Sequence, residues 1–282
     1  MDEARALRHG MVHLLASSVA FGVMAVLVRV AARELPSTQI ACVRFVGSLL
    51  LLLAVARGGG LRPKSGNLPR VLLRGFLGAL AIVFYFAAIE RIGAGLATLL
   101  QCMYPIPTAI IATVFMGETA SRHLAAAILV NVLGLVLVLG SGADLGAANL
   151  PGILIALLGA TFAGAAVATA RHLRASEDAS LITIYFMAVG TVVTVPSLLA
   201  GVAVPSPGVA LALAGVVVTS AAGQWLLHHG LGYAPASRGS LASATSVVTS
   251  ALLEAVLLGT HHGLATWGGA ALMMAAVGLA SR

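Results

Sequence analysis

The chain has 282 residues, of which 60% are hydrophobic and only 9% are charged, and its formal net charge is +7. A water-soluble domain carries about 25% charged residues, so this chain lacks the polar surface of a soluble globule and is predicted to be an integral membrane protein. The basic excess does not indicate nucleic-acid binding, because the Lys and Arg residues lie between apolar segments rather than in one patch with aromatic partners.

Ten apolar segments are long enough to cross a bilayer, since about 20 helical residues span about 30 Å of hydrocarbon. In chain order these predicted transmembrane helices cover residues 11–32, 38–56, 69–89, 94–116, 122–141, 150–171, 180–201, 208–231, 236–258 and 263–281. The predicted fold class is therefore all-α. The first segment is longer than the core of a signal peptide, and we interpret it as an uncleaved span.

The Lys and Arg residues indicate the orientation of the chain. With the N-terminus in the cytoplasm, Arg29, Arg33 and Arg91 lie outside and Arg44 lies within a span. The cytoplasmic set is then Arg5, Arg8, Arg57, Arg62, Lys64, Arg70, Arg74, Arg122, Arg171, Arg174, Arg238 and Arg282. Because cytoplasmic loops carry an excess of basic residues, both termini are predicted to be cytoplasmic and the protein is expected in the inner (plasma) membrane.

The second half of the sequence repeats the first at a shift of 142 residues, which places Gly22 on Gly164, each in the first long apolar segment of its half. The repeat divides the chain into two predicted units, residues 1–145 and 146–282, with five spans each. Because five is an odd number, the second unit enters the membrane from the opposite side. Inverted repeats of this kind supply two related conformations, which is the basis of alternating access in secondary transporters.

Motifs along nearly the whole chain point to one family. They are "RF" at Arg44 and Phe45, the stretch from Ala97 through Leu100 to Pro105, "GE" at Gly117 and Glu118, and the segment "YAPASRGSLASATSVVTSALLEAVLLG" of the second half. With ten spans in five-plus-five form, the chain resembles the EamA branch of the drug/metabolite transporter superfamily. It departs from the family pattern at Thr260, where a second "GE" is usual.

This resemblance implies a bundle around a central cavity, formed mainly by the first, third, fourth, sixth, eighth and ninth spans. It also implies export of amino acids, related metabolites or drugs. We therefore expect a secondary transporter that exports a small metabolite, with the solute and the lipid bilayer as its partners. An importer of a similar solute and a non-transport intramembrane protein are the alternatives.

The fourth span carries the densest group of polar residues expected near the middle of the membrane. Gln101 and Tyr104 are three residues apart and share a helix face. Pro105 removes a helical hydrogen bond and is expected to free the carbonyl of Gln101. Broken helices near the midplane are typical of substrate sites, so we predict that these residues line the cavity. The alternative is a structural kink with Gln101 bonded to a neighbouring helix.

The ninth span is the counterpart of the fourth. At the shift of 142, Ser243 matches Gln101 and Ser246 matches Tyr104. Small hydroxyl residues also allow helices to pack closely, so packing and substrate contact are both open interpretations for the two serines.

The third and eighth spans supply further predicted substrate contacts. Tyr85 lies between two phenylalanines in the third span, and Trp225 lies between Gln224 and the His pair of the eighth. Gln224 and His228 are four residues apart and share a face. His228 titrates near neutral pH in water and offers a route to proton coupling, or it is only solvated at the end of its span.

Arg44 and Glu254 are the charged residues that look embedded in the membrane. Arg44 could bind a substrate carboxylate, but a structural or gating role is favoured because it lies close enough to the outer face to reach water. Glu254 could be a proton or cation site, or a partner for Arg44 or Arg91. We group Arg44 and Glu254 as gating or coupling residues.

Enzyme and metal signatures are not evident in the sequence. It contains neither the Walker A pattern nor HExxH, so we predict no catalytic residues, no cofactor and no enzyme activity. The adjacent pairs His228–His229 and His261–His262 point about 100° apart on a helix, so neither pair makes a metal site by itself. The uncharged polar residues of the fourth and ninth spans favour a neutral or zwitterionic solute over a polyanion.

Overall fold

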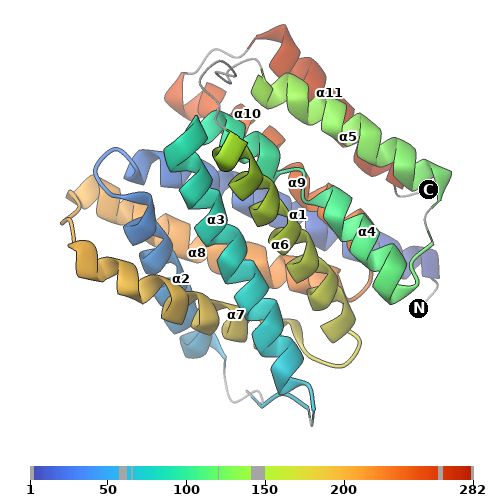
Figure 1. Cartoon of the computed structure of the whole chain (residues 1–282), viewed down its shortest axis with the longest axis horizontal. Helices are drawn as coiled ribbons and strands as arrows, with labels where there is room; N and C mark the ends of the chain where they lie inside the picture. The colour runs from blue at the N-terminus through green and yellow to red at the C-terminus, as the bar shows by residue number, and fades with distance from the viewer. Residues whose placement is uncertain are drawn as a thin grey trace.

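The structure, a computed structural model, describes residues 3–56, 62–64, 66–119, 121–140, 150–259 and 263–280. Within these ranges the chain forms helices and no strand (Figure 1). The elements are α1 (Glu3–Ala31), α2 (Ser37–Val55), α3 (Leu68–Gln101), α4 (Pro105–Met116), α5 (Arg122–Gly140), α6 (Leu150–Leu173), α7 (Ala179–Thr194), the 3-10 helix η1 (Val195–Ala200), α8 (Pro207–Gly230), α9 (Ala236–Ala244), α10 (Ser246–Leu258) and α11 (Leu264–Ala280).

The all-α prediction is confirmed for the described residues. Six segments there are long and apolar enough to cross a membrane by length and composition: Ala4–Ala31, Ser37–Val55, Leu68–Tyr85, Leu150–Leu173, Ala179–Leu199 and Pro207–Gly230. Three further apolar helices are shorter, at Pro105–Met116, Arg122–Leu137 and Leu264–Leu279. Some predicted features lie outside the described residues, namely Arg57, Thr260, His261, His262, Arg282, the boundary at residue 145 and the side chain of Glu254.

The sequence predicts a loop between the third span, which ends at residue 89, and the fourth, which starts at residue 94. This prediction is wrong, because α3 stays helical from Leu68 to Gln101. A straight helix would place Tyr85 and Thr98 about 20 Å apart at 1.5 Å per residue. Their hydroxyl groups are instead 2.7 Å apart and hydrogen-bonded. The helix therefore bends sharply between these residues and its end folds back along its own body. The chain thus reverses without a separate loop between the two helical parts.

The helices pack in pairs that exchange under the shift of 142. The most extensive pairs are α3 with α6, α1 with α8, and α5 with α11. The shift carries α1 onto α6 and α8 onto α3, so the first two pairs are counterparts. Figure 1 shows α3 lying along α6 at the centre, and α5 lying along α11 at one edge. Each repeat therefore packs mainly against the other rather than on itself.

Two matched carboxylate contacts, which we call the clasps, join the repeats. In the Glu34 clasp, the backbone N–H and the hydroxyl of Ser206 each donate to the Glu34 carboxylate at 2.8 Å. In the Glu177 clasp, the backbone N–H of Lys64 donates to Glu177 at 2.9 Å and the Asn67 amide donates at 2.6 Å. Ser206 and Lys64 are matched by the shift. Each clasp ties the loop after the first helix of one repeat to the start of the third helix of the other.

The Glu34 clasp predicts a pH dependence. The two Ser206 donors hold the pKa of Glu34 below its ordinary value of about 4.3, so the clasp contributes fully above that value and is lost as pH falls through the lowered pKa. Thermal unfolding of the wild type and of Glu34→Gln, followed from pH 7 to pH 3, should show a wild-type advantage that disappears at acid pH. Because Glu34 is solvent-exposed, the advantage is small. An advantage that grows at acid pH would contradict the clasp.

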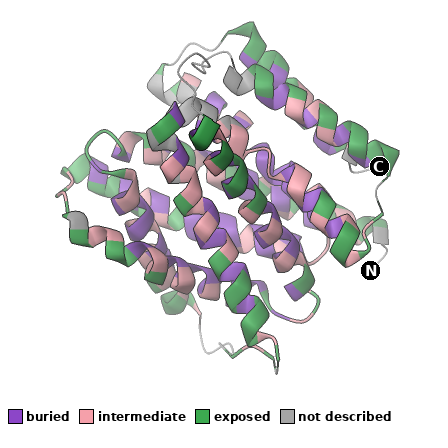
Figure 2. Ribbon diagram, in the orientation of Figure 1, coloured by how far each residue is buried: buried purple, intermediate pink, exposed green. Residues whose placement is uncertain are grey.

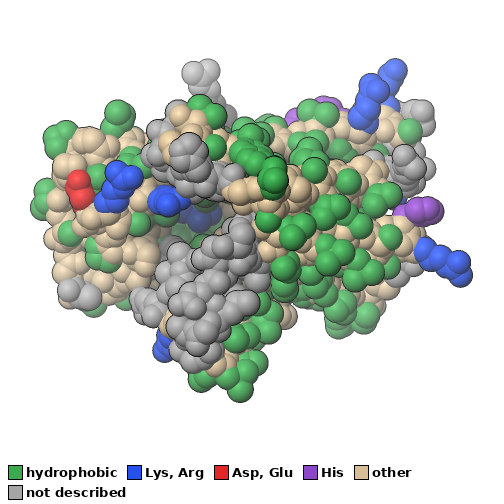
Figure 3. Space-filling view, turned by 90° about the horizontal axis from the view of Figure 1, so that it is seen from above, with side chains coloured by type: hydrophobic (Ala, Val, Ile, Leu, Met, Phe, Trp, Pro, Cys, Tyr) green, Lys and Arg blue, Asp and Glu red, His purple; other side chains and the backbone are tan. Residues whose placement is uncertain are grey.

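The outer surface is apolar and the polar side chains are mostly inside or at the ends. Figure 2 shows the buried residues along the inner faces of the helices. Large hydrophobic side chains such as Phe115, Leu199 and Leu264 are at least 80% exposed. Figure 3 shows hydrophobic side chains over much of the surface to the right of the grey residues, with Lys and Arg side chains projecting at the right-hand end and others lying on the left part of the face. This distribution fits a protein surrounded by lipid, as the composition predicts.

Candidate functional site

The fourth and ninth predicted spans are both broken, and at matched positions. The first break covers residues 102–104, between α3 and α4, and the second lies at Thr245, between α9 and α10. The shift of 142 places Thr245 on Met103. Each break is a tight turn, in which Tyr104 N donates to the Gln101 carbonyl at 3.2 Å and Thr245 N donates to the Ala242 carbonyl at 3.3 Å.

The predicted break at Pro105 is thus present, but the expectation of a free Gln101 carbonyl is wrong. Pro105 starts α4, where its missing N–H costs nothing, and the shortened turn satisfies the Gln101 carbonyl with the N–H of Tyr104. The matched break at Thr245 has no proline, and sequence reasoning does not detect it. The Thr245 hydroxyl bonds to the Ala242 carbonyl at 2.6 Å and to the Ser18 hydroxyl at 2.7 Å, so a side chain substitutes there for the proline.

Each break packs against a glycine of the opposite repeat. A Cβ added to Gly164 of α6 would lie 3.0 Å from the carbonyl oxygen of Tyr104 and 2.8 Å from the nitrogen of Thr108. A Cβ added to Gly22 of α1 would lie 2.9 Å from the carbonyl oxygen of Ser246. Gly22 matches Gly164, and Ser246 matches Tyr104. The two contacts are therefore the same contact made twice, once by each repeat on the other.

Two buried polar atoms beside these breaks have no hydrogen-bond partner among the described residues. They are Oε1 of Gln101, at the end of α3, and Oγ of Ser243, in α9. These residues are matched by the shift, as predicted. Gln101 lies against Gly159 of α6, where an added Cβ would be 2.8 Å from its Oε1. Buried polar groups are almost always paired, so two orphans at equivalent positions mark a place where another group can bind.

Tyr104 connects the two broken spans. Its hydroxyl donates to the Ser240 carbonyl of α9 at 3.1 Å, and the Ser243 hydroxyl is a further polar neighbour. Tyr85 packs with Tyr104 on the same apolar cluster and hydrogen-bonds to Thr98. Ser246 is half-buried at the start of α10. The structure thus brings Gln101, Tyr104 and Ser243 to the breaks, and adds Tyr85 and Ser246 around them.

The eighth-span residues diverge instead of forming one site. Gln224 is 8% exposed and its Oε1 has no partner within the described ranges. Trp225 points elsewhere and its indole N–H donates to the Ser180 hydroxyl at 3.0 Å. His228 is fully buried, so the interpretation that it is solvated at the end of its span is wrong.

His228 belongs to a buried chain of hydrogen bonds. Arg74 Nη2 lies 2.9 Å from His228 Nε2, and His228 Nδ1 lies 2.7 Å from the Thr183 hydroxyl, which in turn donates to the Ala179 carbonyl at 2.7 Å. Arginine has only donors, so Nε2 of His228 accepts and Nδ1 carries the proton. This assignment makes His228 a neutral imidazole.

Arg74 is the residue that sequence reasoning misplaces. The count of basic residues assigns it to the cytoplasmic set, but its side chain is buried within α3, with 3% exposure. Its guanidinium carbon stands 4.5 Å from the ring centre of Phe186. The signal for burial is its position, several residues into a predicted helix with apolar neighbours.

Arg44 is half-buried where α2 packs on α8, which is the counterpart of the packing of α7 on α3 around Arg74. Its Nε donates to the Ser220 hydroxyl at 2.8 Å. The shift matches Arg44 with Phe186 and Ser220 with Gly78, the two residues that surround the Arg74 side chain. The packing of α2 on α8 and the packing of α7 on α3 therefore each contain one inward-facing arginine, and the two arginines lie at equivalent levels. No contact with Glu254 can be assigned, since that side chain lies outside the described residues.

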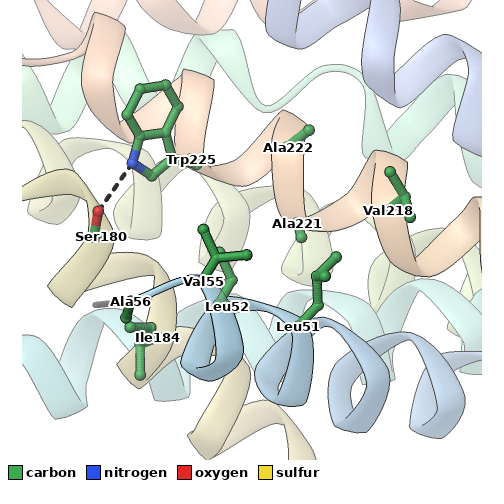
Figure 4. A pocket seen from close by; sticks show the side chains of 10 residues that line it. All are labelled: Leu51, Leu52, Val55, Ala56, Ser180, Ile184, Val218, Ala221, Ala222 and Trp225. Atoms are coloured by element: carbon green, nitrogen blue, oxygen red, sulfur yellow. Dashed lines mark hydrogen bonds between the residues drawn. The ribbon is translucent and has the colours of Figure 1, made fainter. Parts of the chain in front are cut away.

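Two apolar pockets are likewise counterparts. The larger, about 430 Å³, lies between α2, α7 and α8 and is lined in part by Leu51, Ser180, Ile184 and Trp225 (Figure 4). The smaller, about 270 Å³, lies between α2, α3 and α7. The shift matches lining residues of the first pocket with lining residues of the second: Leu51 with Val193, Ser180 with Thr38 and Trp225 with Val83. Gln101 and Ser243 lie in neither pocket.

Comparison with known proteins follows this geometry. The EamA-like transporter family matches the chain twice, over residues 8–140 and 150–282. The Pseudopaline exporter CntI of Pseudomonas aeruginosa is 31% identical over 200 residues, which cover 71% of this chain and 70% of that protein. An uncharacterized transporter of Helicobacter pylori is 25% identical and covers 94% of this chain and 92% of its own length.

A solved crystal structure with 19% sequence identity superposes with a TM-score of 0.80, covering 95% of this chain and 94% of that one. At this identity the likeness concerns the fold. Both halves of the chain match the same family description, and the duplicated packing around the two breaks agrees with that match. The chain belongs to the EamA-like transporter family.

Proposed function

We propose that this protein is a secondary transporter of the inner membrane that exports a small metabolite, an amino acid or a related amphipathic solute, by alternating access. Ten spans act as two inverted five-helix units, residues 1–145 and 146–282, with both termini in the cytoplasm. The export direction is supported by the relative named as an exporter.

The observation that carries this proposal is the exchange of contacts between the repeats. Gly22 packs on the break at Ser246 as Gly164 packs on the break at Tyr104. When each half offers the other the same contacts, swapping the conformations of the halves gives a second arrangement of similar energy. In an inverted pair, that second arrangement opens to the opposite side of the membrane.

The proposed substrate site lies where the two broken spans meet. An unpaired buried carbonyl costs about 1–3 kcal/mol, and a solute that donates an N–H or O–H to Gln101 Oε1 removes that cost. Tyr104 and Ser243 supply hydroxyl groups beside it. These groups are uncharged, which favours a neutral or zwitterionic solute. Tyr85, Ser246 and Gln224 complete the polar lining in this proposal. Trp225 is left out of it, because it lines the larger apolar pocket between α2, α7 and α8.

Substitution of Gln101 by leucine tests the site. We expect flux into proteoliposomes to fall at least about tenfold, equivalent to one lost hydrogen bond of about 1.4 kcal/mol, while thermal stability stays the same or rises, because the variant removes an unpaired buried carbonyl. Ser243→Ala should behave in the same way with a smaller loss. Flux is measured with a panel of amino acids and amphipathic solutes.

Gln39 provides the matched control. Its amide makes two hydrogen bonds, from Nε2 to the Ala203 carbonyl at 2.7 Å and from the Ala203 N–H to Oε1 at 2.9 Å. Gln39→Leu should therefore lower the unfolding temperature and leave flux per folded molecule nearly intact. If Gln101→Leu instead lowers stability and keeps its flux, Gln101 has a structural role. If no solute of the panel moves, the transporter proposal fails, and inward-only flux identifies an importer.

The two inward-facing arginines are the proposed gates. Arg44 bonds to Ser220 where α2 packs on α8, and Arg74 lies over Phe186 where α3 packs on α7, so the two arginines hold equivalent helix pairs together. Glu254 is the group that we propose for proton coupling, because Nε2 of His228 already accepts from Arg74. An imposed pH gradient should drive flux in the wild type if coupling occurs, and equal flux with and without the gradient would exclude it.

A further inference from the structure

Three histidines from two helices that are distant in the sequence meet where the first helix of one repeat lies against the third helix of the other. His9 and His13 are four residues apart on α1, and His229 lies near the end of α8. One ring nitrogen of each lies within 4.8 Å of the others. The ring centres of His9 and His13 are 4.4 Å apart, and those of His13 and His229 are 4.7 Å apart. We call this group the histidine triplet.

One of the three rings has its tautomer fixed by a backbone hydrogen bond. His13 Nδ1 lies 2.8 Å from the backbone carbonyl of His9. Because a carbonyl only accepts hydrogen bonds, Nδ1 carries the proton and Nε2 keeps its lone pair. Metal-binding histidines typically donate their second ring nitrogen to a carbonyl in this way, which fixes both the tautomer and the ring direction.

The third ring is held by aromatic neighbours. His229 stacks on Trp225 with centroids 5.0 Å apart and an interplanar angle of 20°, and it contacts Tyr233 at 5.5 Å. The adjacent His228 faces the opposite way, into the bond with Arg74. The predicted divergence of the two side chains is therefore observed, and it leaves His229 available to the triplet.

We propose that the histidine triplet binds one divalent transition-metal ion of the zinc class. Imidazole nitrogen is a preferred ligand of Zn²⁺, Cu²⁺ and Ni²⁺. Three protein ligands leave one open position in a tetrahedral site, as in zinc sites that hold a water or another small ligand. The triplet is half-exposed or exposed, so an ion reaches it from water.

The charges around the triplet select the fourth ligand. Arg174 is the basic neighbour of His229, and its guanidinium lies against Gly232. A cation beside the site disfavours a second cation unless an anion accompanies it. An anionic ligand at the open position, such as hydroxide or a carboxylate, would offset the added positive charge.

Metal titration of the full-length protein in detergent, purified with a tag that contains no histidine, tests the proposal. Co²⁺ should give the visible absorption bands of a tetrahedral complex at a stoichiometry of one ion per chain, and Zn²⁺ should displace it and raise the unfolding temperature. Cu²⁺ should quench Trp225, which stacks on His229, and Trp225→Phe should remove that part of the quenching.

Single substitutions separate the site from adventitious binding. His9→Ala, at an exposed position, should weaken Zn²⁺ binding at least about tenfold, as should His13→Ala. His123→Ala and His172→Ala change exposed histidines of other helices and should leave affinity unchanged. Equal affinity in wild type and His9→Ala, or octahedral Co²⁺ bands, would overturn the proposal. These readouts do not depend on transport.

Discussion

Replacing His228 by leucine is expected to lower the free energy of unfolding by about 3–5 kcal/mol, because it leaves the charged Arg74 side chain buried without its acceptor. Nε and Nη1 of Arg74 already have no hydrogen-bond partner in the described part of the chain. The bond to His228 and the face of Phe186 are thus the contacts that offset burial of the charge. Thermal unfolding in detergent, followed by tryptophan fluorescence, measures the loss.

The double variant Arg74→Met/His228→Leu separates pairing from packing. Replacing both members of a buried polar pair by apolar side chains of similar size is often nearly neutral, so the double variant should be much more stable than His228→Leu alone. Thr183→Val is the milder control, since it removes only the acceptor of the neutral Nδ1–H and should cost about 1–3 kcal/mol. Additive losses in the double variant would show that the two side chains are not coupled.

The general architecture could be predicted from the sequence because bilayer thickness and backbone satisfaction leave few options for so apolar a chain. The repeat at a shift of 142 is enough by itself to identify Gln101 and Ser243 as counterparts. Composition and periodicity are properties of the whole chain, so a fold prediction based on them does not depend on the exact residue at which each helix ends.

What could not be predicted depends on single side chains. The break at Thr245 has neither proline nor glycine, and it forms because hydroxyl groups of Ser18 and Thr245 satisfy the turn. Arg74 is wrongly assigned to water because counting basic residues assumes that each of them reaches the membrane surface. Its partners, His228 and Phe186, come from the other repeat and are more than 100 residues away in sequence.

The histidine triplet also could not be predicted from the sequence. A pair of adjacent histidines is a poor metal site when judged alone, and the structure agrees, since His228 and His229 point to different partners. The ligands that complete the triplet lie on α1, about 220 residues earlier in the sequence. Local spacing rules do not detect a site assembled by the packing of α1 on α8.

Gly164→Ala is expected to cost about 1–3 kcal/mol of stability, the usual penalty for an overpacked contact, and to abolish most of the flux. The new Cβ would lie 2.8 Å from the nitrogen of Thr108 and 3.0 Å from the carbonyl of Tyr104. These are backbone atoms of the broken span and cannot rotate away. Gly22→Ala should cost a similar amount, since its Cβ would lie 2.5 Å from the Cβ of Thr249.

The two variants differ in how they can be rescued. Thr249→Gly removes the side chain that Gly22→Ala meets first, so the double variant should regain part of the lost stability, whereas no side-chain change relieves Gly164→Ala. Gly268→Ala in α11 is the control, because nothing lies within 4 Å of its added Cβ and the substitution should stabilise its helix by about 0.5–1 kcal/mol. If Gly164→Ala behaves like Gly268→Ala in unfolding and flux measurements, the close packing of each repeat on the other's broken helix is not what holds the two halves together.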